Sequence, residues 1–448
     1  MLSNQSKVNL KMEIKTNYTA SEQEIHDTVS DFMSFCNFIE ERKPKLSMTK
    51  EVLGKNYLFE LNKLLRFQKD VASPNFPQES YPIIDLLFNL AQLGKLFIKK
   101  GDEKGNVYLE SSSRKVEFDS LNSFEKYNFL FETFWTEYDF SEILIWAINP
   151  IDDIIQTFAK SRPGKKLTKG AFSKRKDYDP IFSYNSVLIH YFNFFGFCSF
   201  VPIISENKKL TRHEDNIQEI RPTEFGVNIC KILSTQKMTK WNNRWLENAW
   251  LFDDLEKQDS DNNKLITYLE PVFPSGVLLH TVNNETIKAV KGNFTFKVSL
   301  AKSIWRKIKL SSKHSLEDLH LAIQGAFDFD NDHLYTFFMD GKRYSRNAYH
   351  SPNGNEGPFT DDAIIGKLGL YAGQKILYLF DYGDSWEFAV QLSTINESER
   401  PLKKPEIIEV KGEAPEQYEF EDDEDDEDDE DDDLYEEDEK EIDADAKD

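Results

Sequence analysis

An adjacent aspartate and histidine, together with a cluster of three acidic residues, are the side chains best suited to chemistry. Asp332 and His333 form the adjacent pair, and Asp381, Asp384 and Glu387 form the cluster. Carboxylates with a neutral imidazole can hold a divalent metal and activate its bound water, as hydrolysis requires. A metal-dependent hydrolase is therefore one hypothesis, with His333 and Asp384 as its candidate catalytic residues and Asp332, His333, Asp381 and Asp384 as its metal ligands.

The spacing of these residues matches no known ligand pattern, so we favour structural roles and predict no metal or other cofactor. Asp384 follows Gly383, and short acidic side chains commonly satisfy backbone groups in turns. Arg306 interrupts an apolar strand face and is expected to pair with Asp381 or Asp384. Its structural and functional roles stay open. The predicted polar cluster thus comprises Arg306, Asp332, His333, Asp381 and Asp384.

His320 and two tryptophans are predicted to serve the core. His320 lies four positions after Leu316 on the apolar face of an expected helix, where a histidine is usually a hydrogen-bonded core residue. Trp305 and Trp386 fall in expected strands, which favours packing. A stacking platform for bases would require them to be exposed.

A basic strip free of acidic residues is the other candidate site. It contains Lys160, Arg162, Lys165, Lys166, Lys169, Lys174, Arg175 and Lys176, interrupted by Pro163, Gly164 and Gly170. Such cations neutralise phosphates, so DNA or a DNA-binding protein is the predicted partner. The expected contact residues are Lys165, Lys166, Lys174, Arg175 and Lys176. A solvated, flexible linker is the alternative.

The acidity of the chain is concentrated near its end. The net charge is −24, and residues 421–448 hold 21 Asp and Glu against two lysines. Before residue 421 there are 58 acidic and 53 basic residues, so that part is nearly balanced. The tail has too few apolar residues to fold alone. It is predicted to be disordered, to aid solubility and to contact basic surfaces, in cis or in trans.

Cysteine usage and hydropathy predict a cytoplasmic protein without a membrane segment. Cys36, Cys198 and Cys230 are far apart and form no CxxC pair, which indicates neither disulfides nor a thiolate zinc site. Residues 1–15 lack the apolar core of a signal peptide. The uncharged run Val187–Ile204 is interrupted by His190, Asn193 and Pro202, so a buried helix running into a strand is favoured.

The first two thirds of the chain read as helices interrupted by two hairpins. Apolar residues recur at helical spacing in 21–70, in 83–93 and around 124–135, and a glycine-rich loop at 101–105 separates two short alternating segments. The pattern returns in 182–233, where Thr223 is a plausible N-cap. Two winged-helix-like modules and a single helical domain with two hairpins are the alternatives.

The segment Phe294–Ile395 has the clearest strand signals. Alternating residues predict hairpins at 294–310 and 376–392, and Ser315 with Asp318 predicts a capping box at the start of a helix. Asp340-Gly341 is a favoured hairpin turn, and Thr360 is expected to cap a short helix ending near Gly369. This order implies a mixed antiparallel α+β domain; the label β-grasp-like is added by fold analogy alone.

Motifs in this segment resemble the plasmid pRiA4b ORF-3-like family. They are Ile304-Trp305-Arg306, Ser315-Leu-Glu-Asp-Leu-His320, Asp332-His333-Leu334 and Asp381-Tyr-Gly-Asp-Ser-Trp-Glu387. Less specific motifs further upstream resemble the extension that longer members of this family carry before the domain. The resemblance implies that the gene belongs among those of mobile elements. It implies no particular biochemical activity, because the family has no settled one. The closing segment departs from the family, because Lys411–Tyr418 stands where many members have a Cys-Pro-Pro-Glu-Asp-like segment and a Gly-Gly pair.

Together these observations predict an α+β protein that acts without catalysis, by binding nucleic acid or a protein associated with it. A hydrolase and a protein–protein adaptor are the rivals. The expected divisions are a disordered segment 1–20, a helical or winged-helix-like module 21–158, a basic linker 159–178, a second such module 179–275, a pRiA4b ORF-3-like domain 276–418 and a disordered acidic tail 419–448.

Overall fold

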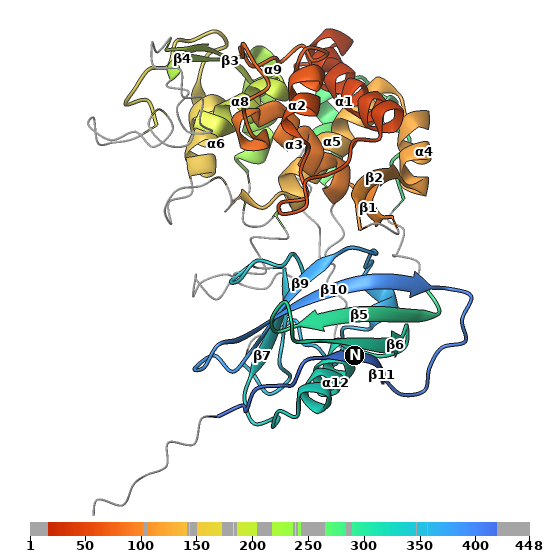
Figure 1. Cartoon of the computed structure of the whole chain (residues 1–448). Coiled ribbons are helices and arrows are strands. Elements are labelled where there is room, and N and C mark those ends of the chain that lie inside the picture. Colours follow the sequence, from red (N-terminus) through yellow and green to blue (C-terminus); the bar gives the residue numbers. More distant parts are fainter. Residues whose placement is uncertain are drawn as a thin grey trace, which may run out of the picture.

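The computed structural model shows a helical region followed by one large sheet, which lies below the helices in Figure 1. The α+β class is therefore confirmed. None of the described helices is both long and apolar enough to cross a bilayer. The structure describes residues 17–102, 105–140, 143, 150–172, 182, 186–203, 217–235, 238, 241–242, 265–283, 289–345, 347–355 and 357–418.

The helical region contains two β-hairpins, each preceded and followed by helices. The first unit consists of α1 (Glu22–Arg42), α2 (Lys55–Asn62), the 3₁₀ turn η1 (Gln78–Ser80), α3 (Pro82–Leu93), β1 (Phe97–Gly101), β2 (Val107–Ser111) and α4 (Ser113–Ser120). The helix α5 (Ser123–Glu137) follows. The second unit consists of α6 (Pro150–Lys160), α8 (Ser186–Phe194), β3 (Cys198–Pro202), β4 (Ile217–Pro222) and α9 (Glu224–Leu233). The short α11 (Leu265–Leu269) and η5 (Glu270–Val272) close the region. The two hairpins predicted from sequence are thus present.

The same hydrogen bonds close both hairpins. In each, the residue after the second strand occupies the N-cap position of the next helix and donates from its amide and hydroxyl to carbonyls that precede the first strand. The bonds are Ser112 N to Leu96 O (2.9 Å) and Ser112 Oγ to Lys95 O (2.6 Å), and Thr223 N to Phe197 O (3.0 Å) and Thr223 Oγ1 to Gly196 O (2.7 Å). Lys95 and Gly196 both have positive φ, at 54° and 78°. The chain therefore repeats one local architecture.

A residue between the first helix and the hairpin pairs with the second hairpin strand in both units. The Leu46 amide donates to Val107 O (2.8 Å) in the first unit. In the second, Leu167 and Ile220 exchange two bonds of 2.8 and 2.9 Å as an antiparallel bridge. Each hairpin is thereby widened at the edge formed by its second strand.

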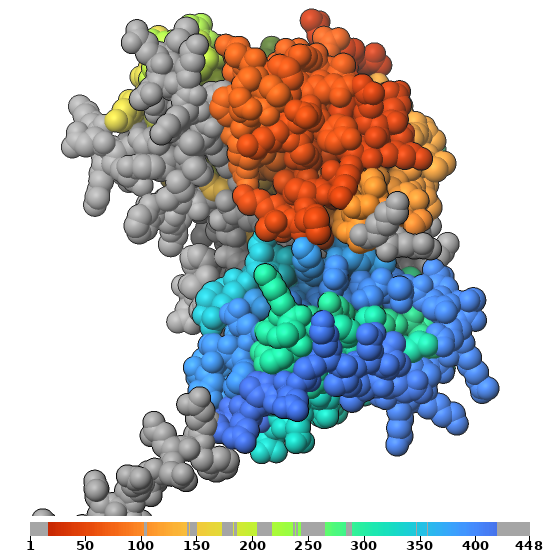
Figure 2. All heavy atoms as spheres, in the orientation of Figure 1, coloured from red at the N-terminus to blue at the C-terminus, as the bar shows by residue number. Residues whose placement is uncertain are grey.

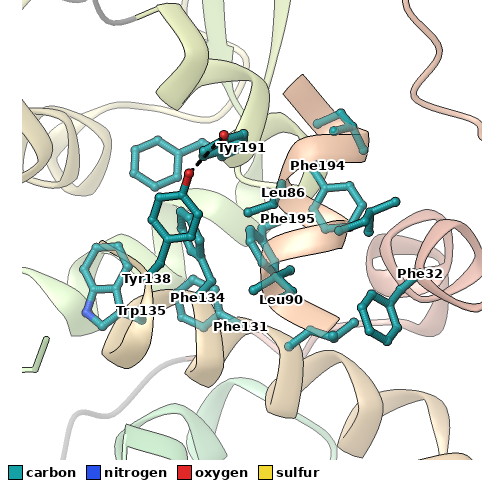
Figure 3. Close-up of a cluster of buried hydrophobic side chains, with 14 of the residues drawn as sticks. Phe32, Leu86, Leu90, Phe131, Phe134, Trp135, Tyr138, Tyr191, Phe194 and Phe195 are labelled. Carbon is teal, nitrogen blue, oxygen red and sulfur yellow. Dashed lines mark hydrogen bonds between the residues drawn. The ribbon is translucent and has the colours of Figure 1, made fainter. Parts of the chain in front are cut away.

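One hydrophobic core serves both units. It extends from Ala20 to Val282, and α3 packs against α8 within it. Figure 3 shows side chains of α1, α3, α5 and α8 meeting in this core, among them Phe32, Leu86, Phe134 and Phe194. The two units therefore share one set of buried apolar side chains.

The C-terminal region is a seven-stranded antiparallel sheet with its own core. Its strands follow the order β11-β6-β5-β10-β9-β7-β8, and α12 (Leu316–Phe327) packs on one face through a cluster that extends from Phe294 to Leu392. The strands are β5 (Asn293–Ser299), β6 (Trp305–Ser311), β7 (Tyr335–Phe338), β8 (Ala348–His350), β9 (Lys375–Phe380), β10 (Trp386–Asn396) and β11 (Glu406–Lys411). The predicted hairpins β5–β6 and β9–β10 are present, whereas β8 and β11 were not foreseen.

Local signals explain where α12 begins and why the next expected helix does not form. The Ser315 Oγ accepts from the Asp318 amide (3.2 Å), and the Asp318 carboxylate accepts from the Ser315 amide (2.8 Å), so the predicted capping box is present. Thr360 does not cap a helix. Its hydroxyl is paired with Tyr335 Oη (2.8 Å) inside the core. Only the 3₁₀ turn η6 (Ile365–Lys367) follows, so that expectation was wrong.

Candidate nucleic-acid interface and polar cluster

The first half of the basic strip lies on the second hairpin as an ordered edge. Leu167 is buried and bridged to Ile220, and the Gly164 amide donates to Pro222 O (2.8 Å). The backbone of this segment is therefore bonded to β4 of the second hairpin at Gly164 and at Leu167. Five cations of this segment are exposed: Lys160, Arg162, Lys165, Lys166 and Lys169. Lys174, Arg175 and Lys176 lie outside the described residues.

Within the part of the chain that the structure describes, a carboxylate neutralises one of these five cations, Lys166, at close range. Glu219 of β4 forms ion pairs with Lys166 and, at 2.5 Å, with Arg221. The bond from Lys166, followed by that from Arg221, lowers the pKa of Glu219. Among the described residues, no carboxylate lies within ion-pair distance of the other four exposed cations. The segment thus carries surplus positive charge on a fixed backbone.

The helices that precede the two hairpins are not available to read DNA. In helix-turn-helix proteins, a recognition helix lies in the major groove and contacts base edges. Here α3 and α8 contain no Lys or Arg, and nearly every side chain of both helices is buried. They pack against each other in the core, so neither of these two helices presents a basic face to a DNA groove.

The polar cluster of the sheet domain brings three of its five predicted members into contact. His333 Nδ1 lies 2.9 Å from Asp332 Oδ1, and its Nε2 lies 3.7 Å from Asp381 Oδ2. The contact forms because β7 and β9 are neighbours, and the Asp381 amide donates to Leu334 O (3.0 Å). Asp384 is exposed in the same turn.

The contact between His333 and Asp332 shifts the pKa of both side chains. The hydrogen bond to Asp332 raises the pKa of His333, and the same contact lowers the pKa of Asp332. Tyr418 Oη bonds to both Asp332 oxygens at 3.0 Å. Burial and then this carboxylate raise the pKa of Tyr418 to about 12.

Asp381 is committed to its turn. Its φ is +54°, and its Oδ1 accepts from the amides of Gly383 (2.8 Å) and Asp384 (3.4 Å). The sequence suggested such turn chemistry for Asp384, whereas in the structure the side chain that accepts the backbone amides of this turn is that of Asp381. No three His, Cys, Asp or Glu side chains within the described ranges are placed to hold a metal together.

Arg306 does not make the predicted pair with Asp381 or Asp384. Its Nε donates to Ala326 O (2.8 Å), and its NH1 lies within 3.1 Å of three further carbonyls. These belong to Trp305 (3.1 Å), Lys411 (3.0 Å) and Gly412 (3.1 Å). The expectation was wrong because main-chain oxygens at the end of α12 and β11 satisfy the guanidinium. Burial lowers its pKa.

Sequence reasoning missed the residues that complete the polar cluster from the chain's closing segment. Gln417 exchanges bonds with the backbone of Asp330, at 2.5 Å and 3.3 Å, and Tyr418 reaches Asp332. Both belong to Lys411–Tyr418, the segment where the family pattern is lost. Gln417 and Tyr418 are far from Asp332 in the sequence, so no short sequence pattern could have indicated that these residues meet.

An antiparallel α+β domain with this polar turn is therefore attached to a helical region with two hairpins. Residues 293–445 match the model of the plasmid pRiA4b ORF-3-like protein family, which confirms the resemblance for this part of the chain. The crystal structure of a protein of unknown function, MM3350 from Methanosarcina mazei Go1, is 24% identical over 28% of this chain and 72% of that chain, with a TM-score of 0.24. No curated protein matches the sequence significantly.

Proposed function

We propose that this protein binds the phosphate backbone of nucleic acid through the edge of its second hairpin. The observation that supports this most is the segment Lys160–Lys169, whose exposed cations are held by the Leu167–Ile220 bridge. A basic surface of fixed geometry can release counterions from DNA on binding. Because its backbone is already ordered, binding does not cost the conformational entropy of ordering a loop. From their place in the basic strip, we expect Lys174, Arg175 and Lys176 to be further contact residues.

The repeated units supply a winged-helix-like frame for this surface. Each has a helix, an extended residue that pairs with the hairpin, a buried helix and the hairpin itself. Because the buried helices cannot enter a groove, binding is expected to be insensitive to sequence. Such contacts are consistent with a non-enzymatic role, either in the mobile-element setting that the family resemblance implies or in a regulatory one.

Removing the unpaired cations tests this function. We expect the variant K160A/R162A/K165A/K169A to bind a labelled 20-base-pair duplex roughly tenfold or more weakly. Its plot of log affinity against log salt should be less steep by roughly 3 to 4. Lys166 is retained because its bond to Glu219 supports the hairpin. Fluorescence anisotropy over a salt series measures both quantities.

The matched control removes four exposed lysines elsewhere: Lys45, Lys55, Lys367 and Lys404. This variant should bind the duplex like the unaltered protein. Equal affinities of the two quadruple variants would refute the proposal. In the same assay, deletion of residues 420–448 should tighten binding at low salt, since the acidic tail competes with phosphates for the cations.

A further inference from the structure

The sheet face opposite α12 presents polar side chains around one tryptophan. In β6 the residues Arg306, Ile308 and Leu310 are buried, while Trp305 and Lys307 on the other face are partly exposed. Figure 2 shows green atoms of the first strands at the surface of this domain, beside the blue strands. We call this surface the open face, and it comprises Lys297, Ser299, Trp305, Lys307, Ala389, Gln391 and Lys411.

Three ammonium groups converge on the Trp305 ring. The Nζ atoms of Lys297, Lys307 and Lys411 lie 4.7, 5.6 and 6.0 Å from its centroid. Lys297 and Lys307 are direct cross-strand partners, an arrangement of like charges that destabilises a sheet. Lys307 is paired with Glu409 (2.6 Å). For Lys297 and Lys411, no carboxylate of the described residues lies within ion-pair distance. This charge arrangement favours an anionic ligand.

The residues beside the Trp305 indole on this face have small side chains. Ser299 is the cross-strand partner of Trp305, and Ala389 is the partner of Ser299 on the next strand. Side chains in strands stand roughly perpendicular to the sheet, so a small serine and an exposed alanine leave room for a flat group alongside the ring. Trp386 offers no such site, because its ring packs against Phe329 (4.9 Å) in the core.

We propose that the open face binds single-stranded nucleic acid, with a base stacked on Trp305 above Ser299 and Ala389 and phosphates on Lys297 and Lys411. Aromatic rings flanked by cations bind unpaired bases with little sequence preference. A duplex keeps its base faces stacked, so it cannot use Trp305. The site goes beyond the proposed phosphate contacts, since it lies on the other domain and requires an unpaired base.

Binding of labelled (dT)20 to the full chain tests the site. To remove the contribution of the Lys160–Lys169 segment, the substitutions are made in the K160A/R162A/K165A/K169A variant. There we expect Trp305→Ala to weaken binding roughly 5- to 150-fold, the range of one lost stacking contact. Trp305→Phe should retain most of the affinity. Lys297→Ala should weaken binding and lower its salt dependence, and Lys367→Ala, an exposed lysine elsewhere, is the control.

The experiments distinguish failure of the single-strand site from failure of the proposed duplex binding. Unchanged (dT)20 affinity after Trp305→Ala would overturn the single-strand site whatever the duplex result. Equal losses for (dT)20 and polyglutamate on Lys297→Ala, without any effect of Trp305→Ala, would likewise leave only an anion patch. Trp305→Ala in the otherwise unaltered chain should not change duplex affinity, so loss of duplex binding there would also count against the assignment.

Discussion

At the scale of single residues, His320 shows how a polar group is accommodated in the sheet core. Its side chain is almost fully buried, and its Nδ1 and Nε2 lie 2.7 Å from Tyr378 Oη and Asn331 Oδ1. Its ring stacks on Tyr335 with centroids 3.6 Å apart. A neutral ring that donates from Nε2 and accepts at Nδ1 satisfies both bonds, and burial lowers the pKa of His320 to about 4.

The buried histidine should make the stability of the sheet domain fall in acid. Because the folded pKa lies below the unfolded value of about 6.5, the unfolded state binds more protons below pH 6.5. Its contribution is complete above that pH and is lost as the pH falls towards 4. We expect a loss of about 2 kcal/mol between pH 7.5 and pH 5. Urea unfolding at both pH values, compared with His320→Gln, should show a smaller pH dependence in the variant; equal dependence would argue against this assignment.

At the scale of elements, Arg306 joins a helix end to two strands. Its guanidinium binds Ala326 O in the last turn of α12 and the carbonyls at the end of β11, and it lies 4.5 Å from the Phe327 ring centroid. A cation near a helix C-terminus is favoured by the helix dipole. One side chain on β6 therefore holds the edge strand β11 and the helix in place.

Replacing this arginine should loosen β11 before the rest of the sheet. Arg306→Met keeps most of the volume but leaves buried carbonyls unpaired, so we expect a stability loss of roughly 2 to 4 kcal/mol. Amide exchange in 406–411 should accelerate more than in β9. Arg343→Met, which removes an exposed pair with Glu387, is the matched control and should cost under about 1 kcal/mol. Similar effects of the two substitutions would contradict the role of Arg306.

At the scale of the whole molecule, a small set of polar contacts joins the helical region to the sheet domain. The Glu51 carboxylate accepts from Lys99 Nζ (2.8 Å) and Tyr371 Oη (2.5 Å), and it is only 14% exposed. Lys375 Nζ donates to Met48 O (2.8 Å). The tip of the first hairpin fits against residue 372, because a Cβ on Gly101 would lie 1.6 Å from Ala372 O.

A side chain at Gly101 should separate the two regions without unfolding either. Gly101→Ala forces the 371–373 segment away, so amide exchange in 46–51 and 371–375 should accelerate and the radius of gyration should increase. Hydrogen exchange and small-angle scattering measure these effects. Gly325→Ala is the control, since its Cβ meets nothing within 4 Å. Unchanged exchange in both segments would show that the contact does not hold the regions together.

The local elements could be derived from the sequence because their signals lie within a few residues. Period-two alternation specified β5, β6, β9 and β10, and the Ser315–Asp318 pair specified the start of α12. The glycine-rich loop specified the first hairpin. The prediction for Thr360 failed because it used a local signal alone. A threonine hydroxyl suits a helix cap, but in the folded core this hydroxyl is hydrogen-bonded to Tyr335.

Contacts between distant segments were decided only by the tertiary structure. The sequence supplied the cations of the basic strip, but the bridge of Leu167 to Ile220 turned them into a fixed edge. Packing also buried α3 and α8 in one core, and it gave Arg306 main-chain carbonyls in place of a carboxylate. Residue types and short periods are encoded locally, whereas burial and partner choice depend on which surfaces meet once the chain has collapsed.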